Sequence, residues 1–277
     1  MNPRVFLKVM IILMLLPSLI CLFLPDMIAS YYTRLMYPAT LFIAAFFSMR
    51  IASIYQGWLR KAFVFLSLFL SLMMLAQLEP HWEIWRTMIG TSFPLMLVLT
   101  QWATYAMLVL CALYVLKVTE LRAISRTGWL AILALGLIGL FILLYHLPSV
   151  LQQISGSRYA DVYTISLVLI RILDVAIVIM LVPVVILYAQ QMKVEGRESV
   201  TFTTIICGII LSLTAAYIYE LVSGVPLYVI RHAVYQTGSI LDAVYLFSYL
   251  IIAAGLYVHK KYDEWGYRTV EKVLAGA

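Results

Sequence analysis

The stretch Tyr163–Tyr188, YTISLVLIRILDVAIVIMLVPVVILY, decides the class of this protein. A helix of about 20 apolar residues crosses the hydrocarbon core of a bilayer, and this stretch is long enough to do so. Its charged residues are Arg171 and Asp174, one helical turn apart. Charged side chains at such a depth are costly and normally face a partner or a wet cavity, so these two residues point to the place where the protein works.

The whole composition agrees with a membrane protein. Hydrophobic residues make up 64% of the chain, charged residues 12%, and the mean hydropathy is +1.00, which excludes a soluble domain. We therefore expect an all-α, polytopic transmembrane bundle of about eight helices. The third apolar run is the shortest, so seven spans with one interfacial segment is the alternative. The runs are Val5–Leu24, Tyr37–Tyr55, Ala62–Leu78, Phe93–Leu116, Trp129–Val150, Tyr163–Tyr188, Val200–Val222 and Thr237–Val258.

The basic residues predict the orientation, because cytoplasmic loops are enriched in lysine and arginine. With eight spans, one side carries Arg4, Lys8, Arg50, Arg60, Lys61, Lys117, Arg122, Arg126, Lys193, Arg197, Lys260, Lys261, Arg268 and Lys272. The other side carries Arg34, Arg86, Arg158 and Arg231. This bias puts both termini in the cytoplasm. We expect the membrane to be a prokaryotic plasma membrane. It also explains the net charge of +6 through topology and contact with membrane lipids, without nucleic-acid binding.

The domain organisation is simple: residues 1–258 form one transmembrane domain, and residues 259–277 form a short cytoplasmic tail. A tail of this length cannot form a hydrophobic core of its own. The sequence therefore places the function within the membrane or in contacts with other proteins.

Polar groups of the last five spans fall in one layer in the outer half of the membrane, by the helical rise of 1.5 Å per residue. Some share a helix face, such as Arg171 with Asp174 and Asp242 with Tyr245. Two interpretations remain open: a network that only fixes helix packing, or an outward-facing pocket for a proton, a cation or a small solute. The candidate ligand-binding residues are Arg171, Asp174, Asp242, Gln101, Tyr217, Glu220, Tyr245 and His146.

Specific chemistries find little support in the sequence. His146 is the histidine that lies well within a span, so a bis-histidine haem site is not expected. The His-Glu-x-x-His zinc motif, serine nucleophile elbows and phosphate-binding glycine loops do not occur. Three scattered cysteines give neither a disulfide framework nor metal-ligand spacing. We expect no catalytic residues, no metal and no cofactor.

The last span carries the run Leu241-Asp242-Ala243-Val244-Tyr245-Leu246-Phe247-Ser248-Tyr249, followed by Ala254-Gly255-Leu256-Tyr257. It resembles the last helix of multi-span, sensor-like membrane regions that precede kinases in prokaryotic, especially archaeal, signalling proteins. The resemblance implies a stimulus-sensing module around Asp242. No signalling output domain follows Tyr257, so such a module would act through another protein.

The sequence thus favours a protein that binds or senses a small solute, or transports it, in an outward-facing polar pocket without catalysis of its own. The alternative is a non-catalytic anchor or scaffold subunit of a larger membrane complex, in which the same charges meet partner proteins.

Overall fold

The structure is a computed structural model that describes residues 3–77, 93–119, 124–156, 162–191, 198–223 and 240–264. Throughout these ranges the regular elements are α-helices, which confirms the all-α prediction. The described part contains eight of them: α1 (Pro3–Ile20), α2 (Asp26–Ala52), α3 (Gly57–Gln77), α5 (Phe93–Val118), α6 (Arg126–Gly156), α7 (Val162–Gln191), α8 (Glu198–Ser223) and α10 (Ile240–Glu264).

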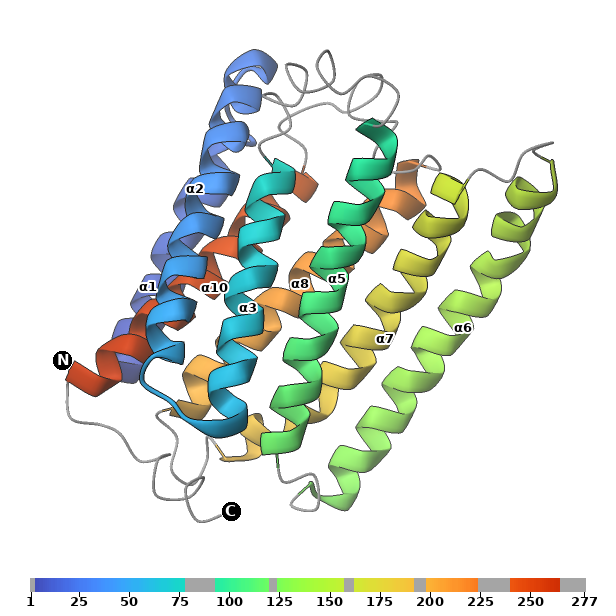
Figure 1. The fold of residues 1–277 in the computed structure, drawn as a ribbon. Coiled ribbons are helices and arrows are strands. Elements are labelled where there is room, and N and C mark those ends of the chain that lie inside the picture. Colours follow the sequence, from blue (N-terminus) through green and yellow to red (C-terminus); the bar gives the residue numbers. More distant parts are fainter. Residues whose placement is uncertain are drawn as a thin grey trace.

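Figure 1 shows that successive helices run alternately up and down. As a result, α1, α3, α6 and α8 begin at the same end of the bundle at which α2, α5, α7 and α10 stop. We call this the basic end, because basic side chains gather in the helix turns there. They include Arg50, Arg60, Lys61, Lys117, Arg126, Lys260 and Lys261. Helix α10 continues to Glu264, beyond Val258, so part of the predicted tail belongs to the last helix.

Four of the described helices are long and apolar enough to cross a membrane: Met27–Ala52, Gly57–Gln77, Leu99–Val118 and Ile240–Lys261. The second of these contains the shortest predicted run, which the structure extends to 21 residues. The remaining helices have shorter apolar segments within the described side chains: Lys8–Ile20, Arg126–Phe141, Ile172–Tyr188 and Val200–Ala216.

The link between α2 and α3 explains why the third run was underestimated. Helix α2 ends at Ala52, and the Ser53 hydroxyl donates a hydrogen bond to the Arg50 carbonyl oxygen. Gly57 then adopts a left-handed φ of 63°, which a residue without a Cβ adopts at little cost. The helix restarts there, so Arg60 and Lys61 lie in its first turns and not in a loop.

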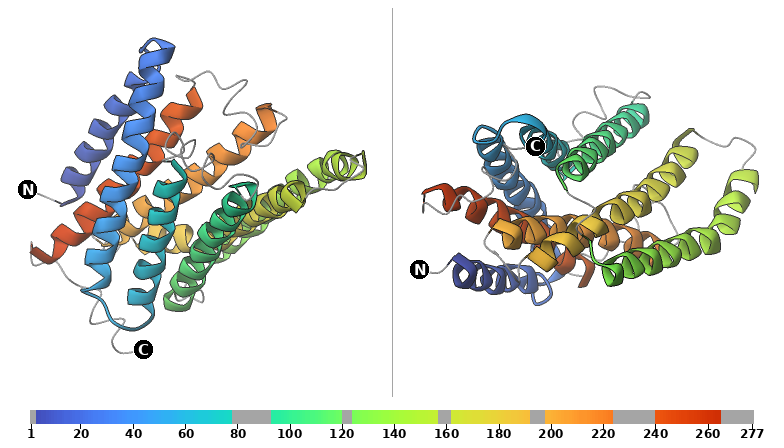
Figure 2. Two further views of the ribbon diagram at one scale, coloured as in Figure 1. Left: turned by 45° about the horizontal axis from the view of Figure 1, so that its top comes forward. Right: turned by 90° about the horizontal axis from the view of Figure 1, so that it is seen from below.

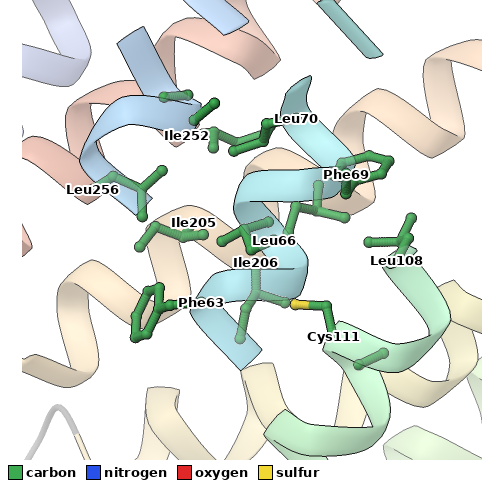
Figure 3. Close-up of a cluster of buried hydrophobic side chains, with 14 of the residues drawn as sticks. Phe63, Leu66, Phe69, Leu70, Leu108, Cys111, Ile205, Ile206, Ile252 and Leu256 are labelled. Carbon is green, nitrogen blue, oxygen red and sulfur yellow. The ribbon is translucent and has the colours of Figure 1, made fainter. Parts of the chain in front are cut away.

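The core lies between α2, α3, α5, α7, α8 and α10, and Figure 3 shows its central side chains. Leu70 of α3 is fully buried, and Leu108 of α5 and Ile252 of α10 are each 1% exposed. Close helix packing in membranes favours small residues at the contacts. At the α8–α10 contact, a Cβ on Gly208 would lie 2.5 Å from Cγ1 of Ile252 and 3.0 Å from the backbone oxygen of Ser248.

A small, partly enclosed cavity of about 30 Å³ lies between α3, α5, α7 and α8. Its walls are apolar, so nothing there would hold a water molecule through hydrogen bonds. Its lining residues are Leu59, Ala62, Phe63, Leu66, Leu108, Cys111, Ala112, Val115, Leu181, Phe202, Ile205, Ile206 and Ile209.

Helix α6 lies at the edge of the bundle, where it packs against α7 (Figure 2). A Cβ on Gly139 would touch Val175 and Ile179 of α7, so a small residue is located where the two helices meet. The other faces of α6 expose large apolar side chains, such as Leu133 and Phe141, which are 62% and 69% exposed. Such a surface suits lipid or a protein partner and not water.

Candidate functional site

Asp174 is held in the interior by a tyrosine of another helix. The Tyr105 hydroxyl donates a 2.6 Å hydrogen bond to Oδ1 of Asp174, which joins α5 to α7. Asp174 is 4% exposed. Tyr105 lies as far from the start of α5 at Phe93 as Asp174 lies from the start of α7 at Val162. The two helices run in the same direction (Figure 1). Matched register thus brings Tyr105 to Asp174, a residue of the predicted polar layer.

Gln101 lies one turn before Tyr105 on α5. Its Oε1 atom is buried and accepts no hydrogen bond within the described part of the chain. A buried amide oxygen without a donor is costly, and such a group in a native protein calls for an explanation. Gln101 therefore supplies a second oxygen acceptor, on the helix whose Tyr105 donates to Asp174. We call Gln101, Tyr105 and Asp174 the Asp174 site.

Asp242 belongs to a different pair of helices. It is 1% exposed, and the Tyr37 hydroxyl of α2 lies 2.8 Å from its Oδ1 and 3.1 Å from its backbone oxygen. The ring of Tyr37 meets that of Tyr249 edge-on, with centroids 5.7 Å apart. The ring centroid of Tyr245, on the same helix as Asp242, lies 6.2 Å from that of Tyr249. This aromatic environment ties α10 to α2.

Four other predicted site residues are placed by their backbones alone. Arg171 lies in α7 one turn before Asp174, His146 lies in α6, and Tyr217 and Glu220 lie in α8. Their side chains are outside the described part of the chain. Whether they join the Asp174 site therefore remains a prediction.

His259 was not among the predicted site residues, although hydroxyl groups and aromatic rings surround it. It is 5% exposed, and both of its ring nitrogens lie within hydrogen-bonding distance of hydroxyl groups. The Tyr55 hydroxyl is 2.7 Å from Nε2, and the Thr201 hydroxyl is 2.8 Å from Nδ1. The imidazole thereby connects α10 with α8 and with the link between α2 and α3.

Aromatic rings surround the His259 imidazole. The Phe202 ring meets the imidazole edge-on, with centroids 4.7 Å apart. The centroids of the Phe63 and Tyr55 rings each lie 5.7 Å from that of the imidazole. Tyr188 of α7 stacks on Phe202 at 5.2 Å. The predicted domain boundary puts His259 at the start of the cytoplasmic tail. The sequence signal that could have found it is the presence of aromatic and hydroxyl residues near the same end of other helices.

The described residues contain no group of three or more histidine, cysteine or acidic side chains that could hold a metal ion. Cys21, Cys111 and Cys207 are free thiols. What the Asp174 site offers is a set of oxygen acceptors in an apolar environment. Such a set can bind a cation, a proton or the hydrogen-bond donors of a solute.

Three comparisons with known proteins add no relative to this picture: no family model, no curated protein and no solved structure matches the chain.

Proposed function

We propose that this chain is a non-catalytic, multi-pass membrane protein that binds a small, positively charged solute at the Asp174 site. The observation that carries the proposal is the buried Asp174 carboxylate that accepts a hydrogen bond from Tyr105. One turn before Tyr105, Oε1 of Gln101 is buried and has no hydrogen-bond donor among the described residues. Intramembrane acids of this kind mark solute, ion or proton sites more often than simple packing contacts.

The chemistry of the site sets the class of solute. Asp174 and Gln101 present oxygen acceptors, which favour a metal cation or an ammonium group. Arg171 is one turn away on α7 and would add an anchor for a carboxylate if its side chain reaches the solute. An amino acid meets both requirements, and a small amine or an inorganic cation meets the first.

The orientation forms part of this proposal. The basic end of the bundle faces the cytoplasm of a prokaryotic cell, in accord with the enrichment of basic residues in cytoplasmic segments. The solute then enters from the opposite side, from which α5 and α7 both begin. The resemblance of the last helix to sensor-like membrane regions adds a direction of signalling, from the solute through the bundle to a protein partner at the basic end.

The test uses two buried aspartates as a matched pair, because each accepts a hydrogen bond from a tyrosine of a neighbouring helix. The protein in lipid nanodiscs is titrated by calorimetry with Na⁺, ammonium, methylamine and a panel of amino acids. We expect Asp174→Asn to lower the affinity of the bound probe about tenfold or more, through loss of the charge. Asp242→Asn should leave the affinity within about threefold and serves as the control.

Two results would contradict the proposal: an affinity unchanged by Asp174→Asn in a correctly folded protein, or an equal loss in both variants. Circular dichroism of each variant establishes that the helices are retained. Failure of every probe to bind would also count against a cation-selective site.

A second candidate function is that of an anchor or scaffold subunit, and the position of α6 favours it. That helix packs against α7, and most of its large apolar side chains between Arg126 and Phe141 are exposed. Crosslinking in the native membrane from cysteine introduced at Leu133 tests this candidate. Consistent capture of one protein would support a subunit role, and capture of lipid alone would contradict it.

A further inference from the structure

Two lysines from different helices converge on one indole ring at the basic end. Nζ of Lys61 in α3 and Nζ of Lys117 in α5 each lie 4.5 Å from the ring centroid of Trp58. They lie 5.7 Å and 5.6 Å from the ring of Tyr114. The two ammonium groups are therefore no further apart than twice their distance from the indole.

The aromatic part of this cluster is built from both helices. Trp58 stacks on Tyr114 with centroids 5.5 Å apart, and Phe65 stacks on the same tyrosine at 5.5 Å and 6° between planes. Lys61 follows Trp58 by three residues, and Lys117 follows Tyr114 by three, so each lysine shares a helix face with an aromatic partner. The stack fixes the helix faces that carry the two charges.

Like charges at short range repel each other, although the rings attract both ammonium groups through cation–π contacts. A bound anion between the lysines offsets this repulsion. Both lysines and Trp58 are exposed, the last to 47%, so an anion can reach them from outside the bundle. Glu120 follows Lys117 by three residues, and its side chain lies outside the described part of the chain.

The position of the cluster favours a lipid as the source of the anion. Trp58 lies in the first turn of α3 and Lys117 in the last turn of α5, at the ends of two helices that are apolar and long enough to cross a membrane. Tryptophan, tyrosine and lysine at this level lie among the lipid headgroups. Acyl chains can then lie along the apolar surfaces of α3 and α5 beyond them.

We propose that Lys61 and Lys117, over the Trp58–Tyr114 stack, bind the phosphate of an anionic phospholipid. The site is separate from the Asp174 site and does not depend on the function proposed for it. Its ligand is a phosphodiester with net negative charge, such as the phosphatidylglycerol headgroup, and not a zwitterionic lipid.

Native mass spectrometry of the purified full chain tests the proposal, with phosphatidylglycerol and phosphatidylcholine added at equal concentration. We expect one phosphatidylglycerol molecule to bind about tenfold or more tightly than phosphatidylcholine, because each lysine near an anionic surface strengthens binding. The double variant Lys61→Gln/Lys117→Gln should lose this preference. Trp58→Leu should weaken it severalfold, and Trp58→Phe should restore part of it.

The control is Arg60→Gln/Arg126→Gln, which removes the same charge from exposed residues at the same end of the bundle. It should keep the preference for phosphatidylglycerol. An equal loss in both double variants would show a diffuse attraction of basic residues to anionic lipid and would overturn the site. So would a preference already absent in the parent.

Two further arms separate the sources of the anion. Inorganic phosphate and glycerol 1-phosphate, each in large excess, should leave phosphatidylglycerol bound. If either displaces it and binds the parent but not the lysine variant, the site takes a soluble phosphate compound and the lipid assignment is wrong. Glu120→Gln removes a negative charge close to Lys117 in the sequence, so it should strengthen phosphatidylglycerol binding or leave it unchanged. A loss of binding would contradict a site that selects its lipid by negative charge.

Discussion

The hydroxyl oxygen of Tyr55 lies 2.7 Å from Nε2 of His259, although the two residues are 204 positions apart in the chain. Thr201 occupies the other ring nitrogen at 2.8 Å. Neutral imidazole has one donor and one acceptor, so one hydroxyl must donate to it while the other accepts from it. The contact therefore fixes the chain between α2 and α3 against α8 and α10.

Removing either hydroxyl should destabilise the protein. Tyr55→Phe and Thr201→Val each leave a buried imidazole nitrogen without its partner, at an expected cost of about 1–3 kcal/mol. The measurement is the free energy of unfolding in mixed detergent. Tyr31→Phe is the control, because Tyr31 is 67% exposed, and its change should stay within about 0.5 kcal/mol. Equal stability of the Tyr55, Thr201 and Tyr31 variants would show that these contacts contribute nothing.

Gly208 should not tolerate a larger residue. Its Cβ would lie 2.5 Å from the Ile252 side chain and 3.0 Å from a backbone oxygen, so Gly208→Ala should force α8 and α10 apart. Overpacking of this kind costs about 1–3 kcal/mol. Thermal unfolding in detergent is the readout, with Gly136→Ala as the matched helical control, because nothing lies within 4 Å of a Cβ there. A Gly208 variant as stable as the Gly136 variant would show that the helices shift freely.

Two serines should each contribute to the α2–α3 contact. The Ser48 hydroxyl donates to the Phe63 carbonyl oxygen at 2.8 Å, and the Ser67 hydroxyl donates to that of Ala45 at 2.9 Å. Hydrogen bonds between membrane helices are worth about 0.6 kcal/mol on average, so Ser48→Ala and Ser67→Ala should each lower stability by roughly that amount.

The control for the two serines is Thr214→Val, which removes an exposed hydroxyl bonded within its own helix. Steric trapping of the unfolded state measures all three variants. A larger loss from the threonine variant than from either serine variant would refute the assignment.

The two aspartates should act independently. Tyr105→Phe removes the hydroxyl that donates to Asp174, and Tyr37→Phe removes the one that donates to Asp242, in different pairs of helices. The stability changes should therefore add in the double variant, with a coupling energy below about 0.5 kcal/mol. A double-mutant cycle in detergent measures the coupling. A larger value would show that both acids belong to one network, as the structural interpretation of the polar layer supposes.

The fold was largely predictable because apolar runs report membrane helices directly. The misjudged boundaries have local causes. Helix α2 begins at Asp26, and the predicted run began only at Tyr37. The prediction started too late because polar residues such as Thr33 and Arg34 interrupt the apolar pattern of the helix. The Thr33 hydroxyl donates a hydrogen bond to the Ala29 carbonyl oxygen of its own helix, so it can be buried there. Hydropathy alone does not reveal this bond.

The candidate site was predictable in part. Depth along each helix placed Asp174 and Gln101 in one layer, and the structure adds Tyr105 as the donor to that aspartate. The Tyr37 hydroxyl as partner of Asp242 was not predictable, because its contact spans 205 positions and depends on how α2 and α10 are rotated. The same holds for His259, whose partners come from two other elements of the bundle.

The apolar cavity between α3, α5, α7 and α8 makes the bundle sensitive to hydrostatic pressure. Unfilled volume of this kind is lost when the helices separate, which favours the separated state as pressure rises. The junction of these four helices is therefore where compression should act first. A valine in place of Ala112, which lines the cavity, would fill part of the volume and raise the pressure that the protein withstands.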